Sequence, residues 1–234
     1  MSLSAIALRL ICTTMFFIPV AFLIFIAFIL FLPILFLLGY FQVLTIGFEK
    51  LGISPGATTF LLFLILIGSG INIPLTKKKL IYGEELRFFG LWRVPKIRAQ
   101  GLFINLGGAV VPVLLSVYFL FRVSKAGFDL EPIFLATILM IIISKFLSRV
   151  IPGRGISLPT LIPPIFSALF ALILAPDFAA PSAFISGVLG TLIGADLLNL
   201  RRAQRFGGFL SIGGAGVFDG IFLVGMVSAL LAGF

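Results

Sequence analysis

Long apolar runs with hardly a charge inside them recur along nearly the whole chain. Each run approaches the roughly twenty residues that an α-helix needs to cross a lipid bilayer. Strands of a membrane barrel would alternate polar and apolar residues, and these runs do not. The pattern predicts an all-α, polytopic transmembrane helical bundle with about seven spans, at residues 8–38, 56–75, 101–121, 132–150, 158–175, 180–200 and 208–232.

The first apolar run is longer than a bilayer requires. Pro19 and Pro33 are expected to kink it, and two shorter segments packed in tandem are the alternative. It is also far longer than the apolar core of a signal peptide, so we expect it to stay as a membrane anchor.

Basic residues fall between the spans and predict an orientation. Of the 17 lysine and arginine residues, all but Lys50, Arg122 and Lys125 lie in the N-terminus and in alternate loops. Because cytoplasmic loops are rich in Lys and Arg, this bias predicts the N-terminus inside and the C-terminus outside. The expected location is the inner, cytoplasmic membrane, crossed several times. The same loops account for the net charge of +9, so no nucleic-acid partner is expected.

The long polar loop at Lys77–Arg98 mixes basic residues with Phe88, Phe89 and Trp92. Aromatic and cationic side chains together suit a segment lying among anionic lipid headgroups, so membrane lipids are an expected partner here. An ordinary positive-inside loop is the plainer interpretation.

The sequence also resembles itself. Residues 66–68 match residues 192–194, and residues 101–111 match residues 207–217. This predicts a single integral membrane domain, 1–234, built from two parallel pseudo-repeats at about 10–121 and 157–232 with a connector span at 132–150. Between residues 101–111 and 207–217, the positions occupied by the same amino acid in both copies are, in the first copy, Gly101, Phe103, Gly107, Gly108, Ala109 and Val111.

Composition narrows the chemistry. Hydrophobic residues make up 61% of the chain, more than a water-soluble fold could cover with polar surface. There is no histidine and a single cysteine, Cys12, so neither a disulfide, a His/Cys metal site nor a histidine-ligated haem is expected. No cofactor is predicted.

Two acidic residues, Asp196 and Asp219, fall inside predicted spans, where an ionisable group is costly and is a candidate site by default. Asn199 shares a helix face with Asp196. Glycines at 213, 214 and 216 precede Asp219 and permit a bend or an unwound turn. In straight helices the two acids would differ in depth by nearly two turns, so some unwinding is needed for them to meet. The candidate binding residues around them are Asn199, Ser211, Asn72, Asn105, Gly214 and Gly216.

Three chemistries fit this pair. Two carboxyl groups in a low-dielectric site share one proton, which equips one as a base and the other as an acid for peptide hydrolysis. A buried acid can also load and release a proton or cation in a coupled transporter. Alternatively, each acid only forms hydrogen bonds with backbone groups exposed around the glycines or with Asn199 and Ser211. Asn72 and Asn105 could line the same cavity or simply join helices by hydrogen bonds.

The motifs INIPL (71–75), LIGADLLNL (192–200) and SIGGAGVFDGIFL (211–223) resemble an uncharacterised family of bacterial and archaeal membrane proteins, the domain of unknown function numbered 1614. That resemblance implies a prokaryotic membrane and no established activity.

The order and direction of Asp196 and Asp219 are similar to intramembrane aspartyl proteases of the presenilin and signal-peptide-peptidase kind. Ala195 and the two residues between Gly216 and Asp219 depart from that pattern. From the similarity in the order and direction of the two acids, we expect an intramembrane aspartyl protease acting on a membrane-protein substrate. The alternatives are a proton- or cation-coupled transporter and a non-catalytic membrane subunit or lipid-binding scaffold. An oligomer is compatible with each of these functions.

Overall fold

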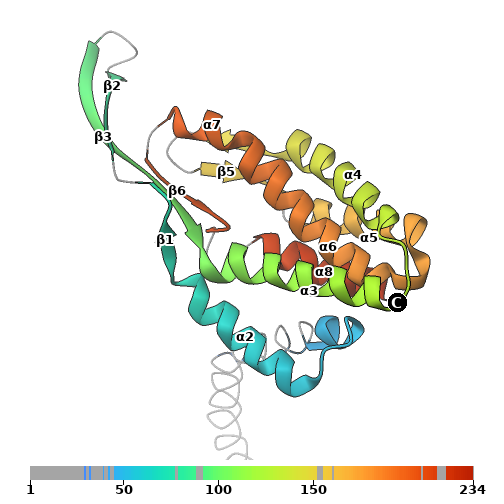
Figure 1. Cartoon of the computed structure of the whole chain (residues 1–234). Coiled ribbons are helices and arrows are strands. Elements are labelled where there is room, and N and C mark those ends of the chain that lie inside the picture. The colour runs from blue at the N-terminus through green and yellow to red at the C-terminus, as the bar shows by residue number, and fades with distance from the viewer. Residues whose placement is uncertain are drawn as a thin grey trace, which may run out of the picture. The chain divides into compact units, whose positions relative to one another are not determined.

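The computed structural model (Figure 1) describes residues 29, 32, 39, 42, 45–76, 79–87, 92–151, 155–159, 161–206, 208–214 and 220–233. The chain divides into two compact units, Met1–Leu44 and Thr45–Phe234. Only four isolated helical residues of the first unit are described, so the predicted span at 8–38 lies outside the described residues. The elements of the fold and the candidate site all belong to the second unit.

Helices make up most of the described part of the second unit, with two π-helices and one 3-10 turn among them. They are α2 (Pro55–Ser69), η1 (Leu106–Val110), α3 (Val111–Lys125), α4 (Glu131–Leu147), α5 (Ile162–Leu174), η2 (Pro176–Phe178), α6 (Ala179–Thr191), η3 (Leu192–Leu197), α7 (Leu198–Gln204) and α8 (Gly220–Ala232).

Two of these helical stretches are long and apolar enough to cross a membrane. Leu106–Lys125 has 20 residues and Pro176–Gln204 has 29. Three more apolar helices are shorter, at Pro55–Ser69, Ile162–Leu174 and Leu223–Ala232. Of the seven predicted spans, those at 101–121 and 180–200 therefore correspond to helices of spanning length within the described residues.

The expectation of an all-α chain is corrected by six described strands. A four-stranded sheet is built around β3 (Trp92–Asn105): β1 (Asn72–Pro74) and β2 (Lys79–Arg87) pair with it antiparallel, and β6 (Gly208–Ile212) pairs with it parallel. A separate antiparallel pair consists of β4 (Arg149–Ile151) and β5 (Gly155–Ser157).

The strands change three predicted segments. Most of Lys77–Arg98, expected as an interfacial loop, is the hairpin of β2 and β3, which extends away from the helices in Figure 1. The predicted spans at 101–121 and 208–232 both begin as strands. Gly208, the first residue of β6, has φ +101°, a conformation that other residues rarely adopt. A short apolar run such as GFLSI fits a buried strand as well as a helix, so hydrophobicity alone could not distinguish them.

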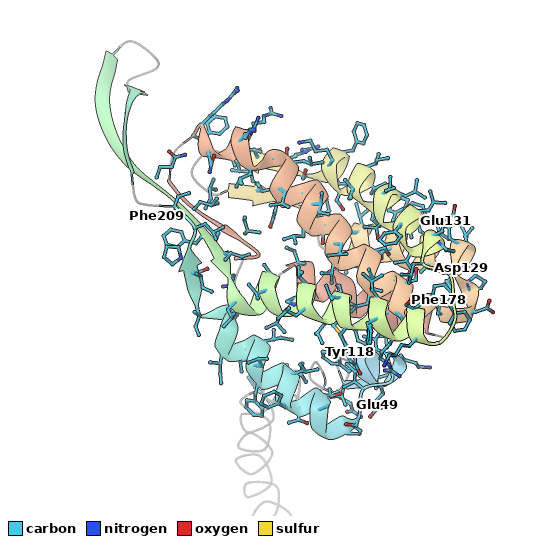
Figure 2. The ribbon with its side chains drawn as sticks, in the orientation of Figure 1. Glu49, Tyr118, Asp129, Glu131, Phe178 and Phe209 are labelled. Atoms are coloured by element: carbon cyan, nitrogen blue, oxygen red, sulfur yellow. The ribbon has the colours of Figure 1, made fainter. Side chains whose placement is uncertain are left out.

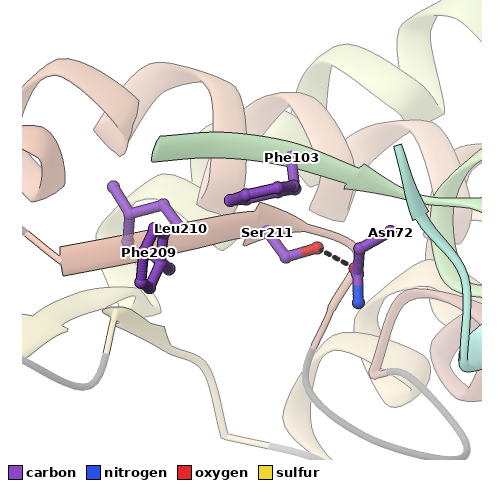
Figure 3. A pocket seen from close by; sticks show the side chains of 5 residues that line it. All are labelled: Asn72, Phe103, Phe209, Leu210 and Ser211. Atoms are coloured by element: carbon purple, nitrogen blue, oxygen red, sulfur yellow. Dashed lines mark hydrogen bonds between the residues drawn. The ribbon is translucent and has the colours of Figure 1, made fainter. Parts of the chain in front are cut away.

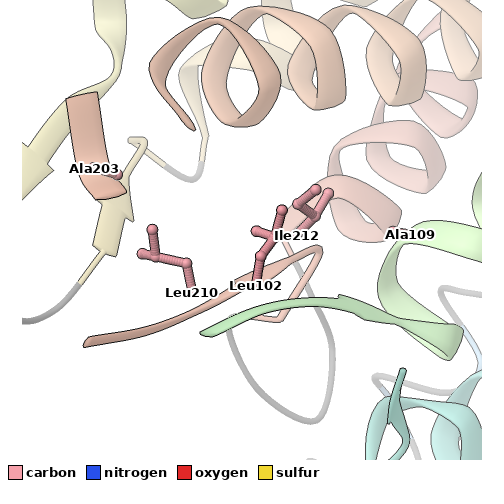
Figure 4. Close-up of a cluster of buried hydrophobic side chains, with 5 residues drawn as sticks. All are labelled: Leu102, Ala109, Ala203, Leu210 and Ile212. Atoms are coloured by element: carbon pink, nitrogen blue, oxygen red, sulfur yellow. The ribbon is translucent and has the colours of Figure 1, made fainter. Parts of the chain in front are cut away.

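One face of this sheet is buried. Leu102 of β3 and Leu210 and Ile212 of β6 form a cluster with Ala109 and Ala203 (Figure 4). The alternation along β6, with Leu210 and Ile212 buried and Phe209 exposed, is that of a strand with one packed face. The sheet is thereby fixed against the helices through η1 and α7.

In α5, small residues face the interior and large apolar residues point outward. α6 packs against α3, α4, α5 and α8. In α5, Ser167, Ala168 and Ala171 are buried, whereas Ile165 and Ile173 are 57% and 66% exposed. This is the reverse of the distribution in a soluble protein and matches helices that approach one another closely through small side chains.

A close backbone approach joins α2 to η1 at Gly68 and Gly107. A Cβ at Gly107 would overlap backbone atoms of Ile65, Gly68 and Ser69, and backbone cannot move aside as the end of a side chain can. Glycine is therefore required at this crossing.

We predict that Gly107→Ala lowers the free energy of unfolding by about 1–3 kcal/mol or prevents folding, because the added methyl group overpacks the crossing. Gly56→Ala, whose Cβ meets nothing within 4 Å, is the matched control and should leave stability unchanged or slightly higher. Thermal unfolding in detergent measures both. Equal melting temperatures for the two variants would contradict the close backbone contact between α2 and η1 at Gly107.

Candidate functional site

Asp196 links the α6–α7 helical stretch to the turn after β6. It lies half-buried in the π-helix η3, and its Oδ2 accepts a hydrogen bond of 3.1 Å from the backbone N–H of Gly213. Gly213 has φ +68°, and a Cβ there would overlap Ala109 and the backbone of Gly108 in η1. Both constraints call for glycine at the residue that binds the carboxylate.

The segment before Asp219 is not a straight helix. Gly208–Ile212 is a strand, and it leads into a turn in which the N–H of Gly214 donates to the carbonyl of Ser211 at 3.3 Å. The expected unwinding is therefore present in the described part of this segment. Asp219 and Gly216 lie outside the described residues, so the distance between the two acids remains a prediction.

The packing of α6 on α8 shows which ends of these helices meet. A Cβ at Gly225 of α8 would contact Val188 of α6, and Ala232, seven residues further along α8, clusters with Ala179 near the start of α6. The two helices are therefore antiparallel. Extending the pairing along both helices brings η3, which comes after α6, level with the start of α8. Asp196 is therefore level with the N-terminal end of α8, whose first residue, Gly220, directly follows Asp219 in the sequence.

Asn72, Asn105 and Ser211, from three different strands, form one hydrogen-bonded group. The Oδ1 of Asn72 accepts from Ser211 Oγ at 2.6 Å and from Asn105 Nδ2 at 3.2 Å (Figure 3). Asn105, only 2% exposed, also donates to the carbonyl of Ser69 and caps η1 by accepting from the N–H of Gly108. The three predicted polar residues are therefore neighbours.

A hollow of about 310 Å³ lies beside this group. It is lined by Asn72, Phe103, Phe209, Leu210 and Ser211, and Asn105 is not part of its lining. The rings of Phe103 and Phe209 meet edge to face, with centroids 5.8 Å apart and an interplanar angle of 64°. The hollow is therefore aromatic on one side and polar on the other (Figure 3).

Asn199 lies in a different group from the one expected. Its Nδ2 donates to Ser148 Oγ at 2.6 Å and to the carbonyl of Ala195 at 2.9 Å, and its Oδ1 accepts from Lys145 Nζ at 2.5 Å. Lys145 also donates to the carbonyl of Leu198. Asn199 thus ties the end of α4 to η3 and α7, close to Asp196 in sequence, and does not contact the hydrogen-bonded group beside the hollow.

Phe103 and Phe209 were not predicted as site residues, although a signal for them was present in the sequence. The internal alignment matches Phe103 with Phe209 and Asn105 with Ser211. In the structure the first pair is in ring contact, and both members of the second pair bond to Asn72. Lys145 and Ser148, whose side chains bind Asn199, carried no such signal, because neither falls in a matched block.

No group of three or more His, Cys, Asp or Glu side chains that could hold a metal ion occurs within the described residues. The candidate site offers two polar groups: the carboxylate of Asp196, which binds the N–H of Gly213, and a second group of two amides and a hydroxyl beside two aromatic rings.

Comparison with known proteins assigns the family. Residues 66–231 match the profile of a family described as "Protein of unknown function (DUF1614)", and the chain belongs to this family. The match covers the whole sheet and nearly all of the helices from α3 to α8. No curated protein and no solved structure matches the chain.

We predict that Asn105→Ala lowers the free energy of unfolding by about 1–3 kcal/mol, because the buried N–H of Gly108 and carbonyl of Ser69 lose their partner. Ser211→Ala, which removes one bond from a partly exposed residue, should cost no more than about 0.5–1.5 kcal/mol. Chemical or thermal unfolding in detergent compares them. An Asn105→Ala protein as stable as Ser211→Ala would show that the cap does not hold η1.

Proposed function

We propose that the protein crosses the cytoplasmic membrane several times, with α7 and the sheet at the cytoplasmic end. The outward-facing side chains of α4 and α5 support this, because large apolar groups such as Phe146, 84% exposed, suit a lipid environment. The β2–β3 hairpin, rich in Lys and Arg, would then lie near anionic headgroups.

The distribution of charge supports the same orientation. Exposed arginines gather on β4 and around α7, at residues 149, 201, 202 and 205. The exposed acids Glu49, Asp129, Glu131 and Asp177 lie at the other end of the helices; Figure 2 labels the first three there, and Phe128 and Phe178 meet beside them. A basic end facing the cytoplasm obeys the positive-inside rule.

Cysteine labelling tests this orientation. In a Cys12→Ala background, we expect Asp129→Cys to react with a membrane-impermeant maleimide on intact cells and Arg202→Cys to react only after permeabilisation. If only Arg202→Cys is labelled on intact cells, the orientation is the reverse of the proposed one. If both variants are labelled on intact cells, both residues lie outside.

We infer further that Asp196 and Asp219 form a hydrolytic pair that cleaves a peptide bond of a membrane-protein substrate. The observation that supports this is the hydrogen bond from the N–H of Gly213 to Asp196 Oδ2, because Gly213 precedes Asp219 by six residues in the sequence. The structural alternative predicts the same bond, so the Asp219→Asn variant decides between them. The antiparallel packing of α6 and α8 supports the same meeting point.

The chemistry derives from two carboxyl groups sharing one proton. The ionised member takes a proton from water as the water attacks the peptide carbonyl, while the protonated member donates its proton to the carbonyl oxygen, which gives a gem-diol. As the C–N bond breaks, the first member passes the proton taken from water to the leaving amine, and the second recovers its proton from a hydroxyl of the gem-diol. The Gly213 N–H holds one oxygen of Asp196. The other oxygen, Oδ1, is then the one assigned to water.

The test is cleavage of a tagged single-span substrate by the reconstituted protein. Because general acid–base groups contribute about 10²–10⁴-fold, Asp196→Asn and Asp219→Asn should each reduce the rate by at least about 100-fold. Asp177→Asn, at an exposed acid of the opposite end, is the control and should retain full activity. Cleavage that persists in either site variant would remove the proposal.

A coupled transporter is the second candidate. One observation favours it: among the described residues, the buried hydroxyls of Ser144 and Ser182 have no hydrogen-bond partner, and both lie in the helical interior. Such groups can solvate a moving cation or proton. Ion flux into liposomes that is lost in Asp196→Asn, with no substrate cleaved by the unmodified protein, would favour transport. Absence of both activities would leave the scaffold alternative.

A further inference from the structure

We propose that the surface where the end of α4 meets α7 is a binding site for an anionic phospholipid, with the lipid phosphate at Lys145 and an acyl chain along α4. This surface is separate from the β2–β3 hairpin, which extends away from the helices (Figure 1). Binding here requires the proposed membrane location of the helices and does not require the proposed hydrolysis.

Lys145, in the last turn of α4, is a half-buried cation held in a fixed position. Its Nζ donates to the carbonyl of Leu198 at 2.9 Å and to Oδ1 of Asn199 at 2.5 Å. Both acceptors are neutral, and no carboxylate pairs with Lys145 among the described residues. Because an ammonium group has three N–H donors, one donor and the whole positive charge remain for an anion.

Two arginines lie beside this ammonium group. Arg202 follows Leu198 by four residues, and the side chains of a helix lean toward its N-terminus, so the Arg202 side chain covers the turn whose carbonyl holds Lys145. Arg149 directly follows Ser148, whose Oγ bonds to the same amide group that holds Lys145. Both arginines are exposed, and within the described part of the chain neither side chain has a hydrogen bond or an ion pair.

Three cations without a counter-ion favour a phosphate group as the ligand. Ammonium and guanidinium groups are the usual protein partners of phosphate oxygens. Basic pockets between helices on the cytoplasmic side of a membrane bind the headgroups of anionic lipids. The positive ammonium group of a zwitterionic lipid would be repelled by these cations, so an uncharged alcohol such as glycerol is favoured on the phosphate.

The apolar part of the site is a stripe on α4 that ends next to Lys145. It consists of exposed side chains at every fourth residue, Phe134, Ile138, Ile142 and Phe146, with exposed fractions from 47% to 84%. The stripe extends over about 18 Å at 1.5 Å per residue, close to the roughly 15 Å that one leaflet contributes to the hydrocarbon core. A lipid with its phosphate at Lys145 can therefore lay an acyl chain along α4.

The site is connected to the helical segment that carries Asp196. Asn199, which accepts from Lys145, donates to the carbonyl of Ala195 in η3. A phosphate that binds Lys145 would therefore stabilise the folded arrangement of α4, η3 and α7, because a ligand that binds only the folded state raises its stability. The melting temperature is thus a second measure of binding.

Lipid binding by the delipidated full-length protein in detergent tests the proposal. Native mass spectrometry compares phosphatidylglycerol with phosphatidylcholine that has the same acyl chains. We expect phosphatidylglycerol to bind at least about tenfold more tightly and to raise the melting temperature further. Glycerol phosphate, which lacks acyl chains, should not displace the lipid. Displacement would assign the site to soluble phosphate esters and overturn the lipid as ligand.

Variants assign the effect to particular side chains. Lys145→Gln removes the charge but keeps an N–H donor for the neighbouring acceptors, and should weaken binding of phosphatidylglycerol about tenfold. Lys145→Arg should retain the preference for phosphatidylglycerol. Arg202→Gln, at an exposed side chain, should weaken binding about fivefold and carries the test if Lys145→Gln does not fold.

Arg87→Gln is the matched control, because it removes one positive charge at the far end of β2, on the same side of the membrane in the proposed orientation. It should change the affinity by less than about twofold, since surface electrostatics fall off within a Debye length. An equal loss in Arg87→Gln and Lys145→Gln would show a general attraction of basic residues and overturn the site.

A phosphatidylglycerol with a photoreactive group in its acyl chain locates the bound lipid. We expect cross-links on α4, and cross-links confined to other elements would overturn the site, as would equal affinities for the two lipids. Because binding is measured in detergent, a reversed orientation in the cysteine-labelling experiment would move the lipid to the other leaflet and leave the site standing. Binding of phosphatidylglycerol without cleavage of any substrate would uphold the site and overturn hydrolysis.

Discussion

The parallel pairing of β3 with β6 is the interaction on which the described structure depends. In apolar surroundings a backbone N–H or carbonyl without a partner is costly, so non-helical chain survives there only where another segment bonds to it. β3 supplies such a segment to β6 along Gln100–Ile104, while β1 bonds to its opposite edge. The pairing sets Ser211 beside Phe103 and brings the turn at Gly213 onto η1. Asp196 can bond to that turn only because the turn is held there.

The helices were largely predictable, and the strands were not. Charges and turn residues bracket α4 and the stretch from Pro176 to Gln204, and their apolar character predicts helices there. GLFIN and GFLSI are too short and too uniformly apolar to show a period of either 2 or 3.6 residues. Their pairing partners lie about a hundred residues apart, so no local signal marks them as strands.

The candidate site was predictable in its residue types but only partly in its grouping. Asn72 and Asn105 were expected either to line one cavity or only to join elements by hydrogen bonds. In the structure both are hydrogen-bonded in one group with Ser211, and Asn105 does not line the hollow. Asn199 was grouped with Asp196 because residues three apart in a helix share a face. Its side chain bonds to Ser148, to Lys145 and to the carbonyl of Ala195, so it links the end of α4 to η3 and α7. Which helix would lie there is a property of the packing and not of the local sequence.

The pairing of β3 with β6 also has a consequence for how the protein is made. β3 emerges from the ribosome long before β6, and α3 to α7 must all be synthesised in between. During that interval one edge of β3 is open, and an open edge can pair with another chain. A factor that shields this edge during biogenesis would therefore raise the yield of folded protein. The turn that binds Asp196 is completed only when β6 arrives, after α3 to α7 have been synthesised.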